Sequence, residues 1–119
     1  FIVILDDDDR LASKNVLSFI NSSIKGTDSM VIWKMMWPTG KVIPGTEYWH
    51  KEPIRGQIGM PCFTVHHSIA KLIQFDAMKA ADLRYFLQLY RMNLNKIWLD
   101  KVMIKTGNTG LRGRPVDMS

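Results

Sequence analysis

The sequence has a single cysteine, no long apolar run and no cluster of basic residues. Because Cys62 stands alone among 119 residues, the chain forms neither an internal disulfide nor a cysteine-based zinc site, which fits a reducing compartment. No apolar run approaches the roughly 20 residues that a membrane-spanning helix needs, so no transmembrane segment is expected. Lysine and arginine are scattered singly from Lys14 to Arg114, without the aromatic and basic signature of RNA-binding domains.

The charge is nevertheless positive overall. A net charge of +5 and a pI near 9.5 suit a polyanionic partner such as nucleic acid, anionic lipid or a nucleotide diphosphate. The scattered distribution weighs against nucleic acid. At this length the chain is at most one domain. It begins without an initiator methionine or signal peptide and with residues typical of an interior strand, so we expect a fragment or the trailing part of a larger domain.

The opening stretch carries the strongest chemical signal. Residues 1–5 are all apolar and predict a strand buried on both faces, which ends in the four carboxylates of Asp6–Asp9. If the backbone stays extended, Asp6 and Asp8 point to one side while Asp7 and Asp9 point to the other. An Asp-x-Asp pair at a strand end can hold Mg²⁺ together with a substrate phosphate. The alternative is a solvated acidic turn that leads into a helix.

The rest of the chain alternates helical and strand patterns and predicts an α/β fold. The expected order is a helix over Arg10–Lys25, a strand over Met30–Trp37 that forms a hairpin with Lys41–Pro44, a long loop over Gly45–Pro61, a strand or short helix over Cys62–Ala70, an amphipathic helix over Met78–Asn93 and a strand over Ile97–Ile104.

Taken together, the stretches LDDDD, IQFDAMKAADLRYFLQL and IWLDKVMIKTGNTGLRG resemble the second half of the catalytic domain of family 2 glycosyltransferases, which have the GT-A fold. The resemblance implies a mixed sheet flanked by helices whose N-terminal half is missing, so that residues 1–119 form a single partial domain on the acceptor side. One edge of its sheet would then be unpaired.

The resemblance also implies an activity. Such a domain transfers a sugar from a nucleotide-diphosphate sugar, most often a UDP-sugar, to a hydroxyl group of a saccharide or lipid-linked acceptor, with inversion and with Mg²⁺ or Mn²⁺. The corresponding setting is cell-surface polysaccharide synthesis in the cytoplasm, at the inner face of the membrane. Nucleic acid is not an expected partner, and a homo-oligomer is compatible with this interpretation.

Two separate acidic positions take the chemical roles that the resemblance implies. Asp8 would bind the metal that bridges the diphosphate, Asp6 would lie near the ribose and the metal, and Asp82 would be the general base. Displacing a nucleoside diphosphate needs both a cation for the departing charge and a base for the acceptor hydroxyl. The family's two glutamates are replaced here by Ala77 and Ala81. The alternative for Asp82 is a purely structural acid in the first turn of a helix.

Further candidates are weaker. Arg112 and Arg114 could close over the diphosphate, or could belong to a frayed basic terminus. Trp49, His66 and His67 could line the acceptor site, or could be packed or merely exposed. Three rival functions remain open: an inactive binding fragment of this fold, a metal-dependent phosphoryl-transfer enzyme or hydrolase, and a small basic protein that binds nucleic acid by charge.

Overall fold

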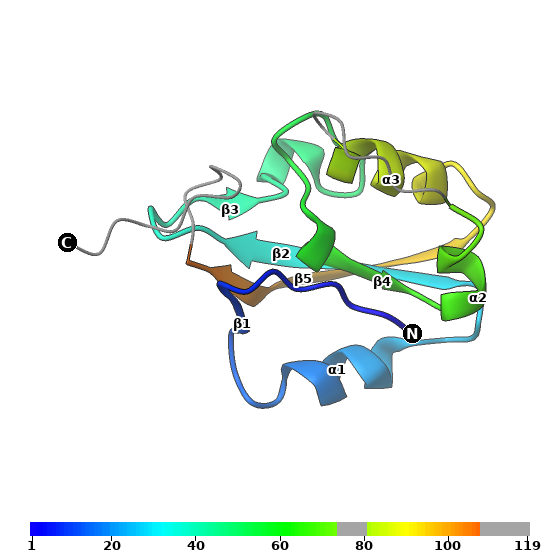
Figure 1. Ribbon diagram of the computed structural model, residues 1–119, viewed down its shortest axis with the longest axis horizontal. Helices are drawn as coiled ribbons and strands as arrows, with labels where there is room; N and C mark the ends of the chain where they lie inside the picture. Colours follow the sequence, from blue (N-terminus) through cyan, green and yellow to red (C-terminus); the bar gives the residue numbers. More distant parts are fainter. Residues whose placement is uncertain (74–80, 108–119) are drawn as a thin grey trace.

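The computed structural model describes residues 1–73 and 81–107, which form a small α/β domain with a mixed sheet flanked by helices (Figure 1). Its strands are β1 (Asp9–Leu11), β2 (Ser29–Met36), β3 (Val42–Ile43), β4 (Phe63–Val65) and β5 (Asn95–Thr106). Its α-helices are α1 (Val16–Ser23), α2 (His67–Ala70) and α3 (Ala81–Tyr90), and 3₁₀ turns cover Thr46–Tyr48 and Met60–Cys62.

Strand β2 lies at the centre of this five-stranded sheet. It pairs in parallel with β5 on one side, and antiparallel with β4 and then β3 on the other. Strand β1 pairs antiparallel with the far side of β5, where Asp9 lies opposite Thr106. This topology therefore brings the acidic run near the N-terminus to the last residues of β5.

The core forms on both faces of β2. Residues 30–33 are completely buried because helices and loops cover the sheet on both sides. Helix α1 lies on one side of the sheet and turns Val16 and Ile20 inward, whereas α3 lies on the opposite side and buries Phe86 and Leu89 (Figure 1). Each helix thus contributes one apolar stripe, as its periodicity predicts.

The prediction of a buried strand over residues 1–5 is wrong. Only Ile2 forms a bridge to the sheet, opposite Val65, and the segment is otherwise irregular. The side chains of Phe1, Ile2, Ile4 and Leu5 are 41 to 44% exposed. Within residues 1–5, only Val3 packs against the core. Strand β4 is short and no second neighbour among the described residues covers this segment, so its apolar side chains face solvent.

The other expected elements are largely confirmed, with shifted ends. The strand over Met30–Trp37 and its hairpin correspond to β2 and β3, and the last strand extends beyond Ile97–Ile104 at both ends to become β5. The segment Cys62–Ala70 contains both alternatives, a strand and a short helix. Of the helix expected over Met78–Asn93, α3 is present and residues 78–80 lie outside the described residues.

The helix expected over Arg10–Lys25 is wrong in its first third. Arg10 and Leu11 belong to β1, opposite Lys105 and Ile104 of β5, and α1 begins only at Val16. Pairing with a distant strand prevails here over local helical spacing. Among the helices that the structure describes, none combines the length and apolar character required to cross a bilayer.

Candidate metal centre

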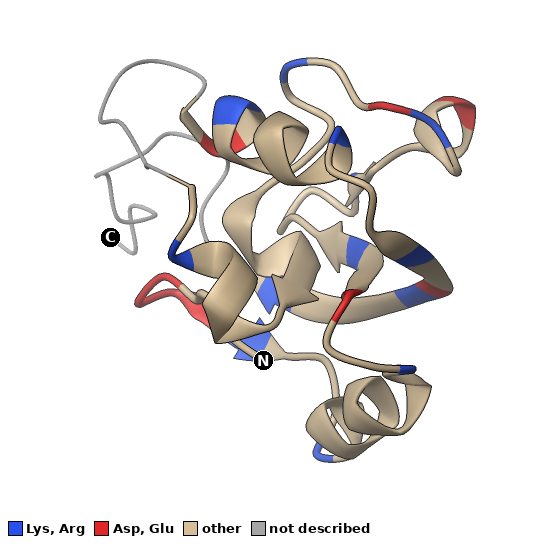
Figure 2. Ribbon diagram, turned by 90° about the vertical axis from the view of Figure 1, so that its right-hand side faces the viewer, with Lys and Arg blue, Asp and Glu red and all other residues tan. Residues whose placement is uncertain are grey.

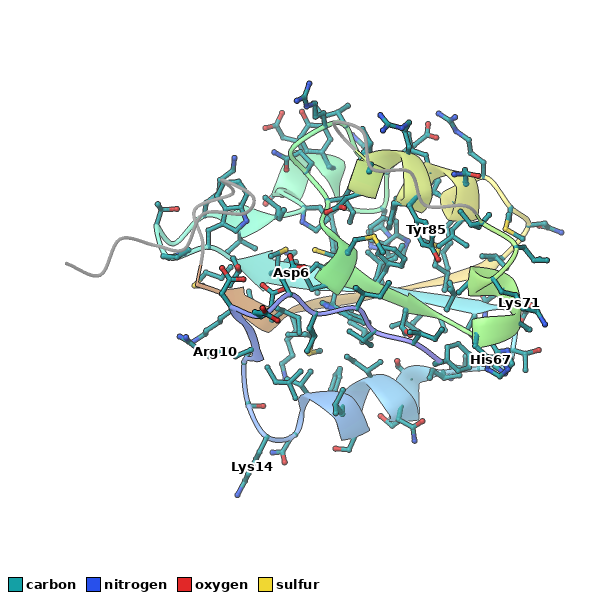
Figure 3. All side chains as sticks on the ribbon, in the orientation of Figure 1. Asp6, Arg10, Lys14, His67, Lys71 and Tyr85 are labelled. Atoms are coloured by element: carbon teal, nitrogen blue, oxygen red, sulfur yellow. The ribbon has the colours of Figure 1, made fainter. Side chains whose placement is uncertain are left out.

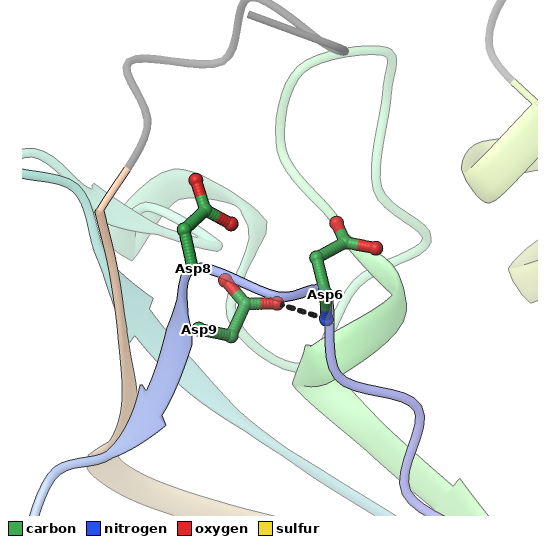
Figure 4. Close-up of side chains that lie close together, drawn as sticks. All are labelled: Asp6, Asp8 and Asp9. Atoms are coloured by element: carbon green, nitrogen blue, oxygen red, sulfur yellow. Dashed lines mark hydrogen bonds between the residues drawn. The ribbon is translucent and has the colours of Figure 1, made fainter. Parts of the chain in front are cut away.

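Asp6, Asp8 and Asp9 bring their carboxylates together in a tight turn that leads into β1 (Figure 4). The backbone amide of Asp9 donates to the carbonyl oxygen of Asp6 at 3.0 Å, and the amide of Asp6 donates to Oδ2 of Asp9 at 2.8 Å. One carboxylate oxygen from each of the three residues lies within 4.8 Å of the others. We call these three residues the acidic trio.

The turn partly corrects the expected geometry. Asp6 and Asp8 do share a side, but Asp9 joins them instead of pointing away. The expectation assumed an extended backbone, in which side chains alternate. Here the chain turns at Asp7 and Asp8, so alternation is lost and Asp9 folds back towards Asp6.

The end of β5 holds the turn in place. The amide of Gly107 donates to the carbonyl oxygen of Asp8 at 2.8 Å, and the hydroxyl group of Thr106 hydrogen-bonds to the carboxylate of Asp9. A Cβ atom at Gly107 would lie 3.2 Å from the carbonyl oxygen of Asp8. The backbone therefore approaches closely at a position where the sequence supplies glycine.

The electrostatics of the trio favour an added positive charge. Partial burial raises the pKa of Asp9, and the nearby carboxylates of Asp6 and Asp8 raise it further, against the opposing effect of its hydrogen bonds. Two unit charges 4.8 Å apart repel by about 3.5 kcal/mol at an effective dielectric of 20, and by less where water reaches them, as it does at Asp6. A cation between the carboxylates would remove this repulsion.

The spacing is suited to a hard divalent cation. Opposite ligands are about 4.2 Å apart around Mg²⁺ and about 4.6 to 5.2 Å apart around Ca²⁺. Three oxygens within 4.8 Å of one another are close to these spans, so a small inward movement of the side chains would let them contact one divalent cation. Exposed acidic groups of this kind also occur without a metal, so the spacing defines a candidate only.

Asp82, the expected base, is partly buried in the first turn of α3. Burial raises the pKa of the Cys62 thiol to about 12, and the carboxylates of Asp9 and Asp82 raise it as well. Both acids therefore lie close enough to act on the same buried thiol. Figure 2 shows the acidic run before β1 as a red turn that projects from the body of the molecule.

His66 and His67 lie at the other end of segment 1–5, where Figure 3 labels His67. The ring of Phe1 contacts that of His66 at 5.5 Å, and an extended chain places Phe1 roughly 16 Å from Asp6. Nδ1 of His66 accepts a hydrogen bond from the amide of Ser68 at 3.1 Å and so caps α2. His66 thus has a local structural role at a distance from the trio.

Trp49 is also remote from the trio. Its ring contacts that of Trp98 at 4.9 Å, and Nζ of Lys34 lies 4.7 Å from its centre. Trp98 precedes Thr106 by eight residues of β5, or roughly 26 Å of extended strand. An acceptor would have to be elongated to contact both Trp49 and the acidic trio.

Several sequence candidates lie outside the described residues, namely Arg112, Arg114, Phe75, Asp76 and Ala77. Conversely, Thr106 and Gly107 contact the acidic turn, although neither residue was predicted from the sequence to be part of the site. A glycine at the end of the last strand, where the backbone can be approached closely, was the available signal. Comparisons with protein-family models, curated proteins and solved structures returned no significant match for this chain.

Proposed function

We propose that this chain is the acceptor-side part of a GT-A glycosyltransferase domain, which moves a sugar from a nucleotide-diphosphate sugar to an acceptor hydroxyl group. The observation that carries the proposal is the convergence of Asp6, Asp8 and Asp9, each with an oxygen within 4.8 Å of the other two. UDP-sugars and a saccharide or lipid-linked acceptor are the substrates that the sequence resemblance favours.

The described residues divide into two roles. The acidic trio would hold Mg²⁺ or Mn²⁺, which when bound offsets the negative charge of the departing diphosphate. Asp82 would accept the proton of the acceptor hydroxyl group, since it is a separate carboxylate that, like Asp9, acts on the buried thiol of Cys62. Gly107 and Thr106 would act by holding Asp8 and Asp9 in place.

The first experiment measures cation binding directly. Titration calorimetry with Mn²⁺ should show one site, and Asp8→Asn should weaken it by about tenfold or more because one ligand loses its charge. Asp7→Asn is the matched control, since it removes the same charge from the same turn but from outside the trio. If both variants weaken Mn²⁺ binding equally, the cation responds to the overall charge of the turn and the proposed site at the trio is wrong.

The second experiment separates transfer from other metal-dependent chemistry. With Mn²⁺ present, a longer chain that includes the N-terminal half implied by the resemblance should hydrolyse a UDP-sugar slowly and transfer its sugar to an added acceptor. Asp82→Asn should keep Mn²⁺ binding and lose transfer by about 10²-fold or more, as expected when a general base is removed. Hydrolysis of simple phosphate esters would favour a phosphohydrolase, and Mn²⁺ binding without turnover would favour an inactive domain of this fold.

A further inference from the structure

Segment 1–5 presents an unpaired backbone edge. Both polar backbone groups of Ile2 face β4: its amide donates to the carbonyl oxygen of Val65 at 3.0 Å, and its carbonyl oxygen accepts from the Thr64 hydroxyl group at 2.6 Å. Because backbone groups alternate along an extended chain, those of Val3 point away from β4. Within the described part of the chain, no hydrogen bond engages the backbone of residues 3–5.

Among the described residues, this segment has the largest concentration of exposed apolar side chains. Phe1, Ile2, Ile4 and Leu5 are all exposed, while Val3 anchors the segment to the core. The segment contains no charge, proline or glycine, and three of its residues are β-branched. Protein sheets normally protect such edges with charges, prolines or bulges, and an unprotected edge is suited to adding another strand.

The two ends of this edge carry different kinds of charge. Asp6–Asp9 follow one end, whereas His66, His67 and Lys71 surround the other (Figure 3). Arg10 and Lys105 offset part of the acidic charge, but four acids against two bases leave that end negative. Lys71 supplies the formal positive charge at its end, because histidine is uncharged near pH 7 and the pKa of His66 is lowered. The edge therefore runs from a positive end to a negative one.

We propose that residues 1–5 pair antiparallel with the same residues of a second copy of this chain, Val3 opposite Val3, to form a two-fold symmetric dimer. Antiparallel pairing places the acidic end of each copy beside the basic end of the other, whereas parallel pairing would place acid beside acid. Charge complementarity of the edge with itself thus selects a second copy as the occupant. Ile2 and Ile4 of both copies would cover each other.

The experiment measures the mass of the sedimenting species by sedimentation velocity for the wild-type chain and its variants. Protein concentrations extend up to about 200 µM, so that weak dimers are also detected. The wild-type chain should sediment as a dimer in low salt. Ile2→Lys with Ile4→Lys should give a monomer, because charges on an edge strand oppose pairing. Ile54→Lys, at a more exposed isoleucine in the loop that precedes the 3₁₀ turn Met60–Cys62, is the matched control and should remain dimeric. A monomeric wild-type chain, or a dimer unaffected by the double lysine variant, overturns the proposal.

A charge exchange tests the orientation without altering the apolar segment. Asp6→Lys with Asp7→Lys should weaken dimerisation by about tenfold, and Lys71→Glu should weaken it in the same direction. Combining all three substitutions should restore much of the affinity, because the charges again oppose each other across the interface. If the combined variant is weakened by the sum of the separate effects, the antiparallel arrangement is excluded. Circular dichroism is used to check that each variant is folded.

Discussion

The backbone amide of Gly107 donates a hydrogen bond of 2.8 Å to the carbonyl oxygen of Asp8. This contact joins the end of the last strand to the acidic turn before the first one, in line with the pairing of Asp9 and Thr106. The positions of the trio's carboxylates therefore depend on a residue from the opposite end of the described chain.

Gly107→Ala should weaken both the fold and cation binding. The added Cβ would lie 3.2 Å from the carbonyl oxygen of Asp8 and 3.3 Å from its Cβ, so the turn must shift by a few tenths of an ångström. We expect about 1 kcal/mol of lost stability and a several-fold loss of Mn²⁺ affinity, measured by urea denaturation and calorimetry. Gly40→Ala is the control: its positive φ of 88° gives strain of similar size in open space, so stability should fall while Mn²⁺ affinity stays unchanged.

Asp9→Asn should stabilise the chain in the presence of EDTA and abolish its stabilisation by Mn²⁺. Asn is uncharged, so it relieves repulsion within the trio, and its side-chain oxygen can still accept from the amide of Asp6. The gain should be about 0.5 kcal/mol, since the site is partly solvated. Thermal denaturation with EDTA and with Mn²⁺ measures both effects. Asp7→Asn should keep the Mn²⁺ response, and a Mn²⁺ response retained by Asp9→Asn would remove Asp9 from the site.

Local sequence patterns correctly predict an element when its burial does not depend on one particular neighbouring strand. The mostly apolar sequence of β2, interrupted by Lys34, and the amphipathic stripe of α3 each predict their own element. Strand β2 lies in the middle of the sheet, and α3 packs one face against the core. Residues 1–5 are equally apolar, yet exposed. Their burial depends on a neighbouring strand, and a local pattern contains no information on whether one is present.

The candidate site is predictable in composition but not in geometry. Four consecutive acids indicate a cation site on charge alone. Which of them converge depends on the turn at Asp7 and Asp8, and that turn is held by Thr106 and Gly107, distant in sequence. The register between β1 and β5 that brings them together is a long-range contact, which no spacing within the acidic run specifies.

Cys62 should react with thiol reagents only when the fold opens. It is fully buried and its pKa is raised to about 12, so about one molecule in ten thousand would carry a thiolate at pH 8. Labelling with a disulfide reagent should therefore be very slow in buffer and should accelerate with added urea in step with unfolding. Rapid labelling in buffer alone, with the circular dichroism spectrum unchanged, would contradict the buried position.

His66 should make the fold less stable in mild acid. Partial desolvation lowers its pKa from 6.5, and the neighbouring His67 lowers it further. A histidine whose folded pKa is lowered contributes stability that is complete above the unfolded value of about 6.5 and is lost as the pH falls through 6.5 towards the folded value. Protonation also removes Nδ1 as acceptor for the amide of Ser68, so the cap of α2 is lost.

His66→Asn keeps a capping oxygen without titrating and should flatten the decrease in melting temperature between pH 7.5 and pH 5. His50→Asn, at an exposed histidine whose φ of 65° asparagine tolerates, should leave the decrease as in the wild type. An equal decrease in wild type and His66→Asn would assign the acid sensitivity to other groups.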